Sequence, residues 1–305
     1  MRVAALLAAV VVGALTGCGD DGAEPGASRE ATLVLDFTPN AVHAGLYAAL
    51  ERGWFADGGL DLELREPGAS TDAPKLLEAG RVEFAVLDIN DWGVARERGL
   101  DLVPVAALVQ VPLAAVIAGD RAAVHRPRDL EGLTVGVTGL PSDDAVLDSI
   151  VARDGGDPGA VDRRVIGFDS VAALAAGRVD AATAFWNAEG VALLELGVPT
   201  REFRVADEVS RPFPELLVVA SGDLVDGDPE AIEALRAGIE RGYTLAADDP
   251  GAALADFLDA QPGLEGEVQE AQMGALIEAD AFAAGLEPGV VDPKRIANWR
   301  RFAGG

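Results

Sequence analysis

Apolar positions along the chain alternate between short runs, typical of buried strands, and stretches with helical spacing. The first run, at residues 33–35, is followed by a turn at Pro39-Asn40, and residues 42–50 then have the apolar period of a helix. Asn40 can accept a hydrogen bond as the N-cap of that helix. Open α/β sheets bind ligands where a strand end passes into a helix. The candidate ligand-binding residues at this turn are Asp36, Phe37, Asn40 and His43.

Further elements follow in a regular order. The pattern predicts strands at residues 60–64 and 84–87 and a long apolar strand region at 102–118, with helices at 73–79 and 92–98 between them. This strand–helix alternation implies parallel strands.

The same plan then recurs. Residues 133–142 repeat the strand, proline and capping residue of 33–40, and Leu-Ala-Ala-Gly-Arg-Val-Asp at 174–180 resembles 77–83. We therefore expect two similar lobes whose strand ends point into one crevice. The candidate residues at these strand ends are Asp88 and Asn90 in the first lobe and Trp186, Asn187 and Glu189 in the second.

These residues indicate a small planar ligand that is polar and either uncharged or weakly cationic. Trp186 is the expected stacking residue, whereas Phe185 is expected in the core. Structural roles without ligand contact remain open for three of these residues. Asp36 could serve as the cap of its turn, Asn40 as the cap of its helix, and His43 as a histidine packed in the interior.

The lobes give a domain division. We expect the first lobe to comprise residues 31–117 and 214–305, including the C-terminal helices, and the second to comprise 118–213. The hinge then lies near Ala118 and Phe213, and we expect ligand binding to close the lobes.

The N-terminus predicts export. Arg2 precedes an apolar segment at residues 3–15 that is too short to span a bilayer, and Leu-Thr-Gly-Cys at 15–18 resembles a bacterial lipobox. Cys18, the only cysteine, is the expected lipidation site, and residues 19–30 read as a flexible tether. We expect an extracytoplasmic protein held at the membrane by lipid.

The amino-acid composition limits the kinds of molecule that the protein is expected to bind. A net charge of −27 disfavours nucleic acid. With only His43 and His125, a histidine-based metal site is improbable, and a single cysteine excludes a disulfide. The sequence contains no phosphate-binding loop and no nucleophile–base motif, so we expect no cofactor. We also expect the protein to be a monomer.

The motifs resemble a known family. Asp-Phe-Thr-Pro-Asn at 36–40, His-Ala-Gly-Leu-Tyr at 43–47 and Gly-Trp-Phe at 53–55 resemble the thiamine-pyrimidine-precursor-binding proteins of ABC importers. The resemblance continues through residues 59–62 and 80–83 and through Phe-Trp-Asn-Ala-Glu at 185–189, so it covers most of the chain. That group also contains riboflavin-binding members and fungal pyrimidine synthases, and its remaining motifs are shared with sulfonate- and nitrate-binding relatives.

The resemblance implies a two-lobed α/β receptor of the periplasmic-binding-protein-like (type II) fold, with a mainly parallel sheet in each lobe and the ligand cleft between the lobes. Such a receptor delivers its ligand to an ABC permease and ATPase. In relatives an aminopyrimidine stacks on an aromatic residue and contacts carboxylate and amide groups. Asp36 and Asn40 match polar positions of the family motif, and Phe37 stands where tryptophan is common. The second-lobe motif is matched by Trp186, Asn187 and Glu189, whereas relatives vary at Asp88 and Asn90.

Two alternatives stay open. The ligand could instead be riboflavin, another heterocycle or a sulfonate. The chain could also be an enzyme like the fungal synthases, which carry a cysteine-rich segment and a histidine after the Gly-Arg-Val-Glu motif. Here Asp91-Trp92 occupies that region and Cys18 is the only cysteine, so we expect a receptor and not an enzyme.

Overall fold

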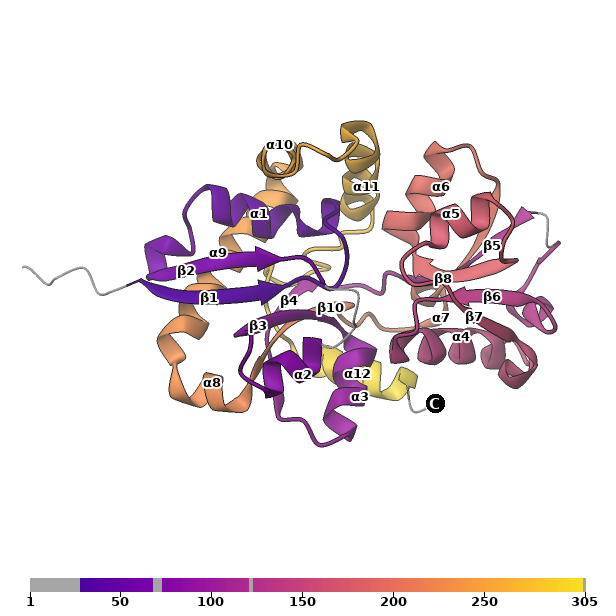
Figure 1. Cartoon of the computed structure of the whole chain (residues 1–305), viewed down its shortest axis with the longest axis horizontal. Helices are drawn as coiled ribbons and strands as arrows, with labels where there is room; N and C mark the ends of the chain where they lie inside the picture. Colours follow the sequence, from indigo (N-terminus) through magenta and orange to yellow (C-terminus); the bar gives the residue numbers. More distant parts are fainter. Residues whose placement is uncertain (1–27, 68–72, 121–122, 304–305) are drawn as a thin grey trace, which may run out of the picture.

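The computed structural model describes residues 28–67, 73–120 and 123–303. The chain forms two lobes, each built on a five-stranded sheet flanked by helices (Figure 1). Cys18 and most of the expected tether lie outside the described residues. The last two tether residues, 29 and 30, belong instead to the first strand, because they pair with residues 60 and 61.

The two sheets have the same topology. The first has the order β2-β1-β3-β10-β4, and the second has the order β7-β6-β8-β5-β9. In each sheet the fourth strand, β10 or β5, is antiparallel to both neighbours, and the pairs among the first three strands are parallel. The strands of the first sheet are β1 (Arg29–Val34), β2 (Leu60–Arg65), β3 (Phe84–Asp88), β4 (Leu102–Val109) and β10 (Leu216–Ser221). Those of the second are β5 (Ala114–Gly119), β6 (Thr134–Val137), β7 (Asp162–Val165), β8 (Ala181–Phe185) and β9 (Thr200–Arg204).

Helices cover both faces of each sheet. In the first lobe α1, α9 and α10 cover one face and α2, α3 and α12 the other (Figure 1). The first-lobe helices are α1 (Ala44–Glu51), α2 (Ala73–Glu78), α3 (Ile89–Glu97), α8 (Gly222–Gly227), α9 (Pro229–Asp248), α10 (Pro250–Ala260), α11 (Gly266–Glu278) and α12 (Pro293–Ala303). The second-lobe helices are α4 (Pro141–Arg153), α5 (Ser170–Ala175), α6 (Val191–Glu195) and α7 (Val205–Glu208). Among the described residues, no helix has the length and apolar character needed to cross a membrane.

Burial on both faces explains the continuous apolar runs of the strands. In β1, Leu33 packs into the core on one side of the sheet and Val34 into the core on the other. Each of these two cores continues into the second lobe, where the first also contains Leu174 and the second contains Val146.

The repeated Gly-Arg-Val motif has the same structural role in both lobes. Gly80 and Gly177 follow α2 and α5 with φ of 59° and 65°, a left-handed conformation that glycine adopts without steric cost. The acidic residue that ends each motif then binds the equivalent strand of its sheet, β1 or β6: Glu83 Oε2 accepts the Thr32 N–H at 2.8 Å. Asp180 Oδ2 accepts the Thr134 N–H at 2.9 Å, so the duplication extends to single hydrogen bonds.

The chain crosses between lobes over residues 110–113 and again over 209–215. The expected boundary at residue 117 lies inside β5, which pairs with β8 and β9 and thus belongs to the second lobe. The apolar region predicted as one strand is two strands in different sheets, separated around Pro112, which cannot donate to a sheet ladder.

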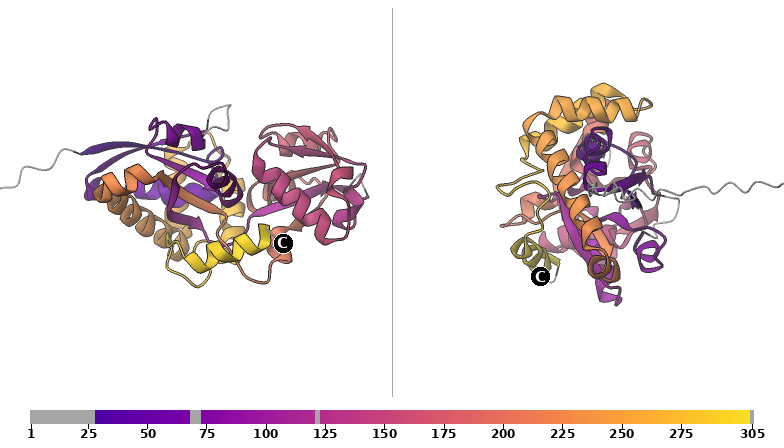
Figure 2. Two further views of the ribbon diagram at one scale, coloured as in Figure 1. Left: turned by 90° about the horizontal axis from the view of Figure 1, so that it is seen from below. Right: turned by 90° about the vertical axis from the view of Figure 1, so that its left-hand side faces the viewer.

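The last helix touches both lobes. The C-terminal end of α12 lies beside the second lobe (Figure 2), where the Arg153 guanidinium of α4 lies 4.6 Å from the centre of the Phe302 ring. Arg153 also donates to the Phe302 carbonyl at 3.3 Å. The C-terminal helix, which the sequence assigned to the first lobe, therefore also contacts the second lobe.

Candidate functional site

A cavity of about 450 Å³ lies between the lobes and is lined from both of them. Pockets for small ligands commonly measure roughly 300–1,000 Å³. Four of the predicted site residues line this cavity: Asp36, Phe37, Asp88 and Glu189. The cavity is also lined by Arg65, Lys75 and Arg98 of the first lobe and by Thr138, Ser142, Asp143, Phe168, Thr183 and Phe185 of the second.

Asp36 is held in place by a chain of hydrogen bonds from the turn behind it. The Asn40 N–H donates to His43 Nδ1 at 3.3 Å, which leaves the ring proton on Nε2 to donate to Asp36 Oδ1 at 2.9 Å. The Asn40 side chain caps the first helical turn by accepting the Val42 N–H. Asn40 and His43 are buried and lie outside the cavity lining, so their role here is to position Asp36.

Asp88 ends β3, lines the cavity and lies beside the buried Glu215. Burial and the charge of Glu215 raise the pKa of Asp88 well above its usual range. Glu215 begins the return into β10, and its Oε2 accepts the N–H groups of Leu113 and, at 3.1 Å, Ala114. It thereby fastens one lobe crossing to the other.

Asn90, the neighbour of Asp88, faces away from the cavity. Its backbone N–H donates to Asp88 Oδ1 at 2.5 Å, and its side-chain Oδ1 accepts the Trp299 indole N–H of α12 at 2.7 Å. The expected contact between Asn90 and a ligand is therefore not supported, because the C-terminal helix occupies that side chain.

Glu189 belongs to the second-lobe turn after β8. Its Oε2 accepts the Phe185 N–H at 3.0 Å. Burial raises the pKa of Glu189 to about 7 against the lowering effect of this and other hydrogen bonds. Near neutral pH this carboxyl group can therefore either accept or donate a hydrogen bond in the cavity.

Three phenylalanines give the cavity its aromatic surface. Phe37 and Phe168 come from opposite lobes and meet edge to face, with ring centroids 4.8 Å apart. Phe185, the last residue of β8, lines the same cavity. A planar ring entering the cleft would meet apolar faces from both lobes.

Trp186 does not lie in the cavity, in contrast to the expectation that it stacks on the ligand. It is buried, its indole N–H donates to the Pro112 carbonyl at 3.1 Å, and the Arg204 guanidinium lies 4.5 Å from its ring centre. Trp186 starts a π-helical turn over Trp186–Gly190, which directs consecutive side chains to different sides. Phe185, expected in the core, faces the cleft instead.

Asn187 also lies outside the cavity lining. Its side chain is fully buried, and both polar atoms lack a hydrogen-bond partner among the described residues. Since the turn over residues 186–190 places Glu189 but not Asn187 at the cleft, only part of this motif can contact a ligand directly.

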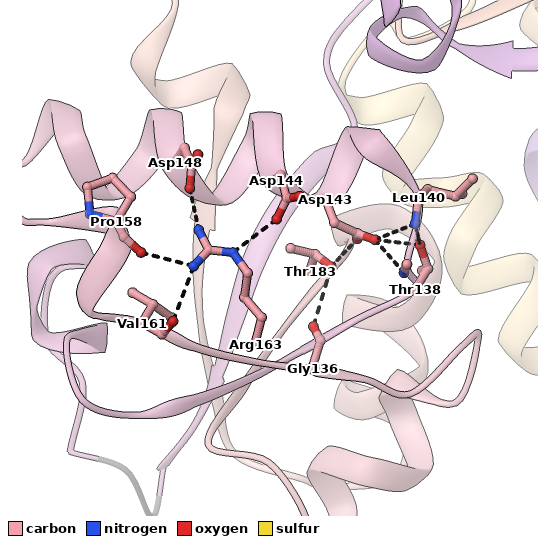
Figure 3. A network of polar contacts seen from close by, with 11 residues as sticks. Gly136, Thr138, Leu140, Asp143, Asp144, Asp148, Pro158, Val161, Arg163 and Thr183 are labelled. Atoms are coloured by element: carbon pink, nitrogen blue, oxygen red, sulfur yellow. Dashed lines mark hydrogen bonds and ion pairs between the residues drawn. The ribbon is translucent and has the colours of Figure 1, made fainter. Parts of the chain in front are cut away.

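The start of α4 forms part of the second-lobe side of the cavity. Asp91 of α3, in the first lobe, reaches across to it and accepts the Ser142 N–H at 3.0 Å and pairs with the Ser142 hydroxyl at 3.1 Å. Asp143 accepts hydrogen bonds from its own turn and from the hydroxyl groups of Thr138 and Thr183 (Figure 3). Burial and the charge of Asp88 raise the pKa of Asp91 to about 8.

Sequence reasoning missed Phe168, Phe185, Asp91 and Glu215. For Phe185 a signal existed, since it occupies the strand end of the second lobe that Asp88 occupies in the first. Phe168 follows a short edge strand, and Glu215 acts through its contact with a crossing segment that is distant in sequence. Among the described residues, no cluster of acidic, histidine or cysteine side chains could hold a metal ion.

Comparison with known proteins agrees with this architecture. The family model described as NMT1/THI5 like matches residues 40–253. The formylaminopyrimidine-binding protein of Halalkalibacterium halodurans is 32% identical over 251 residues, which cover 81% of this chain and 76% of that protein. The 4-amino-5-hydroxymethyl-2-methylpyrimidine phosphate synthase THI12 of Saccharomyces cerevisiae is 21% identical over 79% of this chain and 74% of that protein.

A solved structure has the same fold. The alkanesulfonate-binding protein SsuA from Xanthomonas axonopodis pv. citri superposes with a TM-score of 0.70 at 15% identity, covering 90% of this chain and 89% of that protein. The two-lobed fold expected from the motifs is therefore confirmed. The length of the sequence match and the identity with its relatives show that the chain belongs to the NMT1/THI5-like family.

Proposed function

We propose that this protein is the solute-binding component of an ABC importer and that it captures a neutral aminopyrimidine of the formylaminopyrimidine type. The observation that carries the proposal is the 32% identity, over most of both chains, with a formylaminopyrimidine-binding protein. The interlobe cavity supports it, because a ligand between two lobes can be released by moving them apart.

The cavity has groups that suit an aminopyrimidine. Phe185 offers an apolar face for the ring, and Phe37 and Phe168 add aromatic surface from the two lobes. Asp36, Asp88 and Glu189 supply oxygen atoms that can accept hydrogen bonds from an exocyclic amine, while a protonated Glu189 can donate to a ring nitrogen. Riboflavin or another heterocycle would use the same groups and is the alternative ligand.

An enzyme role is the alternative function, because the yeast relatives are synthases. We propose a receptor without chemistry of its own. The relative at 32% identity is a binding protein, and the yeast synthase matches at 21%. Incubation with the protein should leave the bound pyrimidine chemically unchanged in a mass spectrum.

The test of the proposed function is calorimetric titration of the purified protein with formylaminopyrimidine, hydroxymethylpyrimidine, thiamine, riboflavin and an alkanesulfonate. We expect the two pyrimidines to bind most tightly. Phe185→Ala should weaken their binding about tenfold or more, because the ring loses its apolar contact. The matched variant Trp186→Phe, outside the cavity, should bind as the wild type does.

Two results would contradict these assignments. Binding of riboflavin alone would preserve the receptor but overturn the ligand. Loss of pyrimidine binding in Trp186→Phe, with Phe185→Ala unaffected, would return the stacking role to Trp186.

We further propose that the protein is lipid-anchored through Cys18 on the outer side of the cell membrane. The proposal is supported by the lipobox-like sequence at residues 15–18. Replacement of Cys18 by alanine should move the protein from the membrane to the soluble fraction. Unchanged membrane association would refute the anchor.

A further inference from the structure

Residues 138–143, the turn before α4 and the start of that helix, form one wall of the cavity, and hydrogen-bond donors of this segment are already occupied by carboxyl groups. A helix start has free N–H groups and favours anions, so it is a common binding place for sulfate, sulfonate and phosphate. Here Asp143 accepts the N–H groups of Gly139 and Leu140 at 3.0 and 3.1 Å and the hydroxyl of Thr138 at 2.6 Å (Figure 3).

Asp91 occupies the two donors of Ser142, its backbone N–H and its hydroxyl group. Its Oδ1 accepts the Ser142 N–H, and its Oδ2 lies 3.1 Å from the Ser142 hydroxyl oxygen. Asp143 belongs to α4 itself, whereas Asp91 comes from α3 of the opposite lobe. Both Asp91 and Ser142 line the cavity. Loss of the Asp91 side chain would therefore expose donors to the ligand space and leave the helix's own cap in place.

Building on the proposed function, we propose that Asp91 is a specificity-determining residue that keeps ligands with a tetrahedral oxyanion out of the cleft. It does so by occupying, from the other lobe, the donors with which the start of α4 would bind such an anion. A neutral heterocycle does not need those donors and can use the carboxyl groups of the cavity instead.

The exclusion does not depend on the charge of Asp91. Because the pKa of Asp91 is about 8, a large share of this side chain is protonated near neutral pH. The carboxyl oxygen that accepts the Ser142 N–H can do so in either protonation state. Asp91→Asn retains an oxygen of similar position and should therefore still exclude anions.

The test uses a matched pair of probes and three variants. The probes are hydroxymethylpyrimidine and its phosphate monoester, with inorganic sulfate as an independent anion, each titrated calorimetrically. Asp91→Ala opens the donors, Asp91→Asn keeps them occupied, and Asp144→Ala removes an exposed acid from the same helix without freeing them. If Asp91→Ala does not fold, Asp91→Ser serves instead, since its side chain is too short to hold both contacts.

We expect the wild type to bind the neutral pyrimidine and to show no binding of sulfate at millimolar concentration. Asp91→Ala should bind sulfate and the phosphate monoester at least about tenfold more tightly than the wild type, the factor typical of one hydrogen bond to a charged group. Asp91→Asn and Asp144→Ala should behave as the wild type does.

The inference is overturned if Asp91→Ala gains no anion binding, if Asp144→Ala gains as much, or if the wild type binds the phosphate monoester as tightly as the neutral pyrimidine. Failure of the proposed function has a different signature. In that case neither the wild type nor any of the variants binds the neutral pyrimidine, while the sulfate titrations still show whether Asp91 excludes anions.

Discussion

At the scale of single residues, the cleft contains carboxyl groups that hold protons more tightly than they would in the unfolded chain. Burial is the first cause of the raised pKa of Asp88, Asp91, Glu189 and Glu215. Asp88 lies close to both Glu215 and Asp91, so the charge of Glu215 further raises the pKa of Asp88, and the charge of Asp88 further raises that of Asp91. A buried group whose charge is not fully compensated lowers the stability of the folded state.

This arrangement predicts that the protein becomes less stable as the pH rises. Unfolded carboxyl groups titrate near pH 4, whereas folded Glu189 and Asp91 titrate at about 7 and 8. Between these values the folded state binds more protons than the unfolded state, so the free energy of unfolding falls from pH 5 to pH 8. Urea unfolding of the ligand-free protein at pH 5, 6.5 and 8 measures this slope.

Variants separate this effect from the general repulsion caused by the high net charge. Asp91→Asn removes one titrating group and should flatten the slope, whereas Asp144→Asn, on the exposed side of α4, should leave it nearly unchanged. A wild-type stability that rises over this interval, or equal slopes in wild type and Asp91→Asn, would refute the assignment.

At the scale of elements, the same unit is built twice. A short helix ends at a left-handed glycine, a strand follows, and the acidic residue between them binds the neighbouring parallel strand, β1 or β6. The strand then ends at the cleft, with Asp88 in one lobe and Phe185 in the other. The repeated glycine is therefore required for backbone conformation, and the divergent strand end supplies the chemistry.

Two glycine substitutions should consequently have opposite effects on stability. Gly80→Ala should destabilise the protein by about 1 kcal/mol, because φ is 59° there although an added Cβ meets no other atom. Gly274→Ala, at an open position inside α11, should stabilise it by up to about 1 kcal/mol through helix propensity. Denaturant midpoints measure both, and a stabilising Gly80→Ala would show that this turn does not require glycine.

At the scale of the whole molecule, the lobes are joined by two crossings, and several of the contacts that link them are polar. Glu215 fastens the crossings to each other. Across the cleft Asp91 binds Ser142, and Gln272 Nε2 of α11 donates to the Ala188 carbonyl at 3.2 Å. Polar contacts of this kind exchange readily with water, which suits a hinge between rigid bodies.

We therefore propose that ligand binding shifts the lobes toward a more closed arrangement around residues 110–113 and 209–215. Small-angle scattering with saturating hydroxymethylpyrimidine should give a smaller radius of gyration than the ligand-free protein. Phe185→Ala, at a ligand concentration that saturates only the wild type, provides the control and should show no change. Identical profiles for free and bound wild type would refute closure.

The sequence alone was sufficient for the architecture and for part of the site. Apolar periodicity and the repeated motifs predicted two similar α/β lobes, and the Asp-Phe-Thr-Pro-Asn turn predicted the cleft positions of Asp36 and Phe37. Such features follow from local rules: strand and helix periods, caps, and glycines at left-handed positions. They need no knowledge of distant contacts.

Only the tertiary structure decided which of several residues adjacent in sequence line the cavity. Phe185 and Trp186 are adjacent and both apolar, and their burial depends on which side the turn after β8 presents to the cleft. Asn90 is turned away by Trp299, which lies 209 residues further along the chain. Asp91 reaches Ser142 only because α3 and α4 meet across the lobes. Periodicity indicates that a residue is buried, but packing between distant segments determines what it is buried against.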